Sequence, residues 1–303
     1  MVATTGIAAD LAAAVAGPDA KLDQIVADSA SPHDFQLSAD DRQTLEEADL
    51  VVSIGSGLEP GIPLDQVDAP QWALTENVGE LLPFEEAGAH EREEAAEGEE
   101  HSEEDEHAEE DEHSEEEAPA EEDEHAEEHG SGDPHVWMDP TRVAAALPSL
   151  ADALGDVDRV DPAAYRDRAE GYADELGELD AELERTLARI PAADRELVTS
   201  HDSLRYFAER YGFEVVATAF PASGPEAEAS AAALREVIDA ARDSGVAAVF
   251  AQADDDPEAL RLVADEAGVE IEEDVLVESP AETGTYEEML RRDAELIANA
   301  LAG

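Results

Sequence analysis

Short apolar runs rich in β-branched residues alternate with helical patterns along the first 55 residues of the chain. The run VATTGI and the fully apolar run LVVSIG are typical of buried strands, and the residues between them carry the spacing of amphipathic helices. Ser38 is a suitable N-cap for the second of these helices. Strands that alternate with helices predict a parallel sheet covered by helices. The expected strands are 2–7, 21–27 and 50–55, and the expected helices are 8–16 and 38–48.

The second half of the chain repeats this alternation after two helical segments that each begin with Asp-Pro, at 139–154 and 161–190. A helix of about 30 residues is about 45 Å long, which is too long for an ordinary crossover connection. We therefore expect an α/β protein of two Rossmann-like lobes with parallel sheets, joined by one long rigid helix. The predicted boundaries are 1–158 for the first lobe, 159–190 for the linking helix and 191–303 for the second lobe. Strands are expected at 196–201, 214–220, 246–252 and 270–278, before a closing helix.

Charge changes the expected partners of this protein. The chain has 80 acidic and 17 basic residues, and its formal net charge is −63. The segment 85–133 contains 26 of the acids, so the rest of the chain is also strongly acidic. Nucleic acid and anionic membrane surfaces are poor partners for this protein, because their phosphates would repel it. Lys21 is the only lysine, and this composition indicates adaptation to high salt in a halophile, where the Debye length shrinks to about 3 Å.

Cysteine is absent, so histidine and carboxylate side chains are the available metal ligands. No stretch approaches the ~20 consecutive apolar residues of a membrane helix. The chain runs from Met1 straight into the first expected strand, without the basic start and longer apolar block of a secretory signal. Either the protein is cytosolic or a leader has been removed.

Three of the nine histidines lie outside the acidic segment, and each of them, His33, His135 and His201, is expected at a strand end or a helix start. Ligands of parallel sheets bind at the carboxyl ends of the strands, where such loops meet. A single histidine at a helix start is more often a helix cap or a packed ring. Here all three histidines outside the acidic segment are expected at strand ends or helix starts, and this favours one shared metal site. Neutral imidazoles suit zinc, manganese or iron, and a divalent ion also needs an acidic ligand. Composition does not select that carboxylate.

The blocks SPHDFQLSADDRQTLEEADLVVSIGSGLE, DPHVWMDP and SHDSLRYFAERYG carry a resemblance over nearly the whole chain. The chain resembles the solute-binding proteins of zinc and manganese ABC importers, the cluster A-I metal-binding family. This resemblance implies metal ligation in the cleft between the lobes by His33, His135 and His201. Glu278 stands where the family has Asp, so it could bind directly, bind through a water or be displaced. Pro60 interrupts a segment that is helical in the family.

The resemblance implies a protein that is not an enzyme and that captures zinc and delivers it to an ABC permease. It also implies a monomer outside the cytoplasm, at the cell surface or anchored to a membrane. His201 favours zinc, because relatives tuned to manganese often have Glu there. The alternatives are a manganese- or iron-binding protein of the same type, a zinc-dependent hydrolase, and a metal-storage protein or surface adhesin.

The acidic segment 85–133 also contains six histidines, the first of which is His90. It matches the acid- and histidine-rich loop of zinc-specific relatives, and we expect a disordered loop that collects metal for the cleft. In the alternative, it is a salt-adapted insertion whose carboxylates raise the pKa of the histidines and weaken metal binding. Deletion of 88–130 followed by zinc titration separates the two. The expected auxiliary ligands are His101, His107, His113, His125 and His129.

Overall fold

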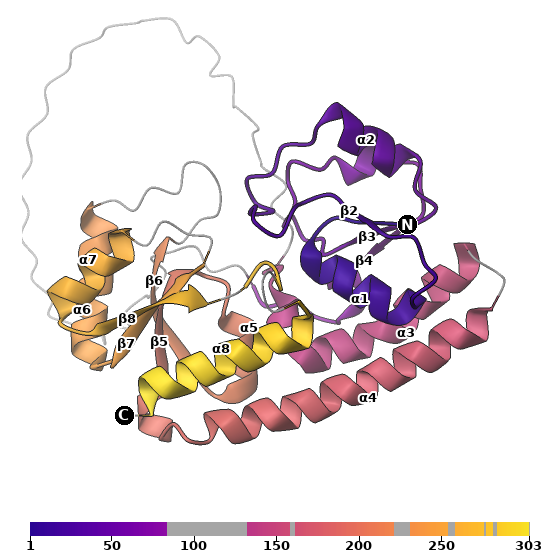
Figure 1. Cartoon of the computed structure of the whole chain (residues 1–303). Helices are drawn as coiled ribbons and strands as arrows, with labels where there is room; N and C mark the ends of the chain where they lie inside the picture. Colours follow the sequence, from indigo (N-terminus) through magenta and orange to yellow (C-terminus); the bar gives the residue numbers. More distant parts are fainter. Residues whose placement is uncertain are drawn as a thin grey trace, which may run out of the picture. The chain divides into compact units, whose positions relative to one another are not determined.

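Two parallel sheets of four strands each organise the computed structural model of the protein (Figure 1). The strand orders are β2-β1-β3-β4 and β6-β5-β7-β8, and every pairing is parallel. The predicted class, an α/β protein with two parallel-sheet lobes, is confirmed. The structure describes residues 1–83, 132–157, 161–220, 231–253, 258–275, 277–280 and 284–302.

The strands of the first lobe are shorter than the apolar runs that predict them. The run at 2–7 forms a strand only as far as Ala3, because the Thr5 side chain accepts a hydrogen bond from the Ala8 amide and starts a helix. Ser38 caps the second helix as expected, with a reciprocal capping box to Asp41. The elements are β1 (Val2–Ala3), α1 (Gly6–Ala16), β2 (Asp23–Gln24), α2 (Ala39–Glu46), β3 (Val51–Ser53), η1 (Leu64–Gln66), β4 (Gln71–Ala73) and η2 (Thr75–Asn77).

Three elements follow the acidic segment: η3 (Val136–Met138), α3 (Pro140–Val157) and α4 (Pro162–Leu187). The Asp161 side chain caps α4 by accepting from the Ala164 amide. A buried stripe along α4, which includes Leu176 and Leu183, packs against α1, α3 and α8 (Figure 1). One hydrophobic core therefore continues along this helix between the two sheets. The division into residues 1–158, 159–190 and 191–303 stays a prediction.

The second lobe contains the strands expected at 196–201 and 214–220 with those bounds. The strand expected to reach residue 278 ends at Val275, and Val277 and Glu278 beyond it are also buried. No helix among the described residues has the length and apolar content needed to cross a membrane. The elements are η4 (Ala192–Asp194), β5 (Glu196–His201), α5 (Arg205–Tyr211), β6 (Glu214–Phe220), α6 (Ala231–Ser244), β7 (Ala248–Gln252), α7 (Glu258–Ala267), β8 (Glu270–Val275) and α8 (Tyr286–Leu301).

Candidate metal centre

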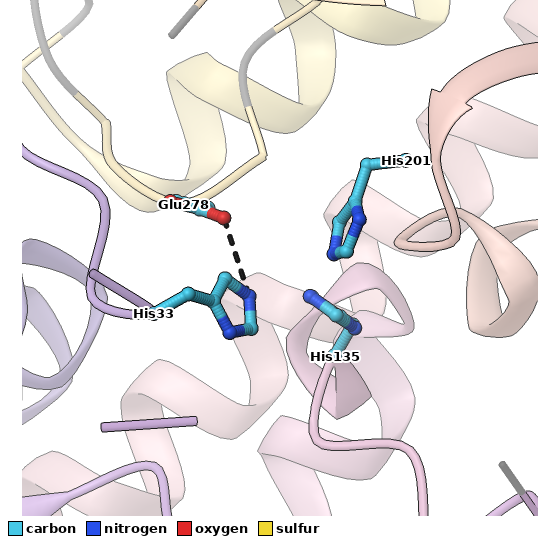
Figure 2. Close-up of side chains that lie close together, drawn as sticks. All are labelled: His33, His135, His201 and Glu278. Carbon is cyan, nitrogen blue, oxygen red and sulfur yellow. Dashed lines mark ion pairs between the residues drawn. The ribbon is translucent and has the colours of Figure 1, made fainter. Parts of the chain in front are cut away.

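Three imidazoles and one carboxylate from distant parts of the chain meet in the structure, those of His33, His135, His201 and Glu278 (Figure 2). One ligand atom from each of the four side chains lies within 4.8 Å of those of the others. The ring centroid of His33 is 5.6 Å from that of His135 and 5.3 Å from that of His201, and the remaining pair is 5.4 Å apart. Glu278 Oε1 lies 3.3 Å from His33 Nε2. The structure thus brings together all four residues that the sequence predicts.

Secondary structure explains how these side chains reach one place. His201 is the last residue of β5, and Glu278 lies three residues beyond the end of β8. His33 lies in the connection from β2 to α2, and His135 directly precedes η3. In parallel sheets the connections that leave the carboxyl ends of the strands gather at one edge. The alternation of strands and helices therefore places loops from both sheets around the same point.

Two of the imidazoles, those of His33 and His201, are held in their neutral form. Burial, and then the neighbouring His135 and His201 rings, lower the pKa of His33 to about 2. Burial and the His135 ring lower the pKa of His201 to about 3, although Asp133 and the Phe220 backbone oppose this shift. A neutral imidazole keeps a lone pair for a metal ion, whereas a protonated one cannot bind metal. These two rings are therefore ready to bind metal at neutral pH without losing a proton.

The donor set fits a borderline transition metal. The Nε2 atoms of His33 and His135 are buried and have no hydrogen-bond partner, which is unusual for polar atoms. Imidazole nitrogen suits zinc, copper, iron and nickel, whereas magnesium and calcium prefer oxygen ligands. Within the described part of the chain this is the one group of three or more histidine and acidic residues close enough to share an ion. Such a site can take up a single divalent ion.

Two neighbours of the site were missed from the sequence. Asp133 Oδ1 accepts from the His135 amide at 2.9 Å and lies 2.7 Å from His135 Nδ1. Trp137 Nε1 donates to the backbone oxygen of Val277 at 2.7 Å, immediately before Glu278. The signal for Asp133 was its position two residues before His135, but carboxylates are too common in this chain for spacing to single it out. The predicted auxiliary ligands His101, His107, His113, His125 and His129 lie outside the described residues.

A metal-binding protein with two parallel-sheet α/β lobes is the class that this fold and site define. The model of the family described as "ZnuA: Zinc-uptake complex component A periplasmic" matches residues 1–300. The chain belongs to this family.

Relatives of this protein bind several metals, according to their names. The chain is 38% identical over 280 residues to the high-affinity zinc uptake system protein ZnuA of Paracoccus denitrificans, a match that covers 89% of this chain and 82% of the relative. It is 26% identical over 273 residues to the iron-binding protein YfeA of Yersinia pestis, covering 89% and 74% of the two chains. A manganese-bound mutant of a periplasmic metal-binding protein from Candidatus Liberibacter asiaticus has the same fold, with a TM-score of 0.76, 18% identity and coverage of 99% and 98%.

Proposed function

We propose that this protein binds one zinc ion with high affinity and delivers it to a membrane permease. His33, His135, His201 and Glu278 are the proposed ligands. The observation that carries the proposal is the meeting of these four buried or nearly buried side chains from four separate segments of the chain. The family and the name of the Paracoccus relative support zinc uptake as the purpose of the site.

The proposed ligands need only a small movement to close around an ion. Zinc–nitrogen bonds of about 2.0–2.1 Å place tetrahedral ligand atoms about 3.4 Å apart. The four ligand atoms here lie within 4.8 Å of one another, so side-chain shifts on the order of 1 Å complete the site. Glu278 is longer by one methylene than the family's Asp, and either a direct bond or a bridging water satisfies the charge of the ion.

Nitrogen donors support zinc over manganese. Three imidazoles and one carboxylate form a nitrogen-rich set, and affinity at such a set follows an order in which zinc exceeds iron and manganese. Manganese or iron as cargo is the second candidate, and the iron-binding and manganese-bound relatives favour it. A hydrolase is disfavoured, because Glu278 lies beside the three imidazoles at the position that a catalytic water would have to occupy. Capture without chemistry is the proposed activity.

The proposed setting is outside the cytoplasm. Relatives are described as periplasmic, and we propose that the protein acts as a monomer at the outer face of the membrane and docks on the permease of an ABC transporter. We also propose that the acidic segment 85–133 collects zinc for the cleft. The division into residues 1–158, 159–190 and 191–303 is part of the same proposal, with the ligands contributed from both lobes.

Competition binding tests the proposed function. Metal-free protein is titrated with zinc in the presence of manganese, in molar salt, and compared with His135→Ala, His201→Ala and Glu278→Gln. We expect one tight zinc ion per wild-type chain, its loss in the histidine variants and weaker binding in Glu278→Gln. Glu273→Gln is the matched control, because this carboxylate pairs with Arg261 rather than with a histidine, and we expect its change to leave zinc binding intact. Unaltered tight binding in the histidine variants would refute the proposed site and support storage by the acidic segment.

A further inference from the structure

Asp133 makes a close polar contact with the imidazole of His135. Its Oδ1 atom lies 2.7 Å from His135 Nδ1 and also accepts from the His135 backbone amide at 2.9 Å. Asp133 is 2% exposed and His135 is 0% exposed, so water does not compete for this contact. Two bonds from the same residue to one oxygen fix both the main chain and the ring of His135.

The contact determines which ring nitrogen of His135 is available. A carboxylate oxygen can only accept a hydrogen bond, so the Nδ1 atom facing it carries the proton. A neutral ring with its proton on Nδ1 has its lone pair on Nε2, and His135 Nε2 is the buried atom without a hydrogen-bond partner. The other tautomer would place an N–H group, which cannot bind metal, toward the site.

Asp133 is itself held in place from both lobes. Its backbone amide donates to the Leu82 oxygen at 2.8 Å, and its backbone oxygen accepts from the Tyr206 hydroxyl at 2.8 Å. The same hydroxyl accepts from the Leu82 amide at 2.9 Å. Tyr206 belongs to α5, which follows the strand that carries His201. The Asp133 carboxylate is therefore a fixed reference point for the His135 ring.

We propose that Asp133 is the positioning residue for His135 and that it sets the tautomer and the angle at which Nε2 meets the metal. This inference rests on the proposed function, because it assigns His135 as a zinc ligand. Carboxylates that accept from metal-binding histidines typically change metal affinity by about 10–100-fold when they are removed. We expect a loss of that size for Asp133→Asn and for Asp133→Ala.

The experiment uses Asp139→Asn as a matched control. Asp139 belongs to the same DPHVWMDP block and is also buried, but its Oδ1 accepts from the amide and hydroxyl of Thr141 rather than from a histidine. For all variants the zinc dissociation constant is measured by competition. The His135 tautomer in metal-free protein is read from the ¹⁵N shifts of the ring nitrogens at neutral pH. The isosteric Asp133→Asn keeps the test valid where Asp133→Ala fails to fold.

The two readouts separate positioning from simple support of the fold. We expect the wild type and Asp139→Asn to hold the proton on Nδ1 and to bind zinc alike. In Asp133→Asn the tautomers should mix, because an amide can donate or accept, and zinc should bind about 10–100-fold more weakly. A lower melting temperature with the tautomer and affinity unchanged would overturn the inference. A wild type that binds no zinc would overturn the proposed function, while the tautomer measurement would still decide the role of Asp133.

Discussion

The indole of Trp137 connects the segment of His135 to that of Glu278, and Trp137→Phe tests this connection. The side chain is 0% exposed, and its Nε1 atom donates to the Val277 backbone oxygen at 2.7 Å. Phenylalanine keeps an aromatic ring but removes the donor, which leaves a buried carbonyl unpaired at a cost of about 1–3 kcal/mol. The smaller ring also leaves a cavity that costs about 1 kcal/mol. We expect a loss of about 2–4 kcal/mol in the free energy of unfolding.

Zinc binding should fall as well, because the residue after Val277 is a proposed ligand. Trp72→Phe is the control, since Trp72 is also buried and donates from Nε1 to Ser149 Oγ at 2.9 Å, a contact within the first lobe. Denaturant unfolding and zinc competition are measured on both variants. We expect both to lose stability and only Trp137→Phe to bind zinc more weakly. The reasoning is refuted if Trp137→Phe loses less than about 1 kcal/mol, or if the two variants lose zinc affinity equally.

Acid should destabilise the metal-free protein through His33 and His201, whose pKa values in the folded state are lowered to about 2 and about 3. The unfolded chain binds more protons below pH ~6.5, so each ring costs about 1.4 kcal/mol per pH unit as the pH falls below that value. The free energy of unfolding is measured at pH 7.5 and at pH 5.0. It should fall more between these values in the wild type than in the double variant with asparagine at both positions. An equal fall in the two proteins would contradict the prediction. Gly6→Ala should lower the melting temperature and weaken zinc binding, because its new Cβ would lie 2.6 Å from Asp28 Oδ1, which must move, and 3.1 Å from Ser279 Oγ, beside the ligand segment. Gly171→Ala, which meets nothing within 4 Å in the middle of α4, should instead raise the melting temperature and leave zinc binding unchanged.

The spacing of apolar residues along the chain predicted which strands and helices form better than it predicted the residues at which they begin and end. The strands at 196–201 and 214–220 have the expected bounds. Residues 2–7 form one apolar run, but the run contains the end of a strand and the start of a buried helix. Hydrophobicity alone does not show where the strand ends and the helix begins. The Thr5 side chain marks it, through a hydrogen bond that starts α1. The boundary between this strand and this helix is therefore set by a helix cap. A single polar residue within an apolar run is only weak evidence for such a cap in the sequence.

Prediction of the site followed a different rule. Histidine is rare outside the acidic segment, so the positions of His33, His135 and His201 at expected strand ends carried information. Carboxylates number 80, so no acidic residue could be singled out by type or spacing. Glu278 was identified through the family resemblance, and Asp133 was not identified at all. What distinguishes these two from the other acids is burial beside an imidazole, a property that only the folded chain displays.

The same abundance of carboxylates gives a reason for the proposed site to be rich in nitrogen and closed to water. Sodium, potassium, magnesium and calcium prefer oxygen ligands, and an exposed acidic surface attracts them without distinguishing one from another. In the molar salt that the composition predicts, that attraction would be screened within about 3 Å, so surface charge would add little affinity for a scarce ion. The buried imidazoles of His33 and His201 are different, because their pKa values are lowered, which favours the neutral form, and because hard cations bind imidazole poorly. In the proposed zinc site, discrimination against these hard cations would therefore come from the three rings, and the single carboxylate of Glu278 would offset part of the charge of the ion.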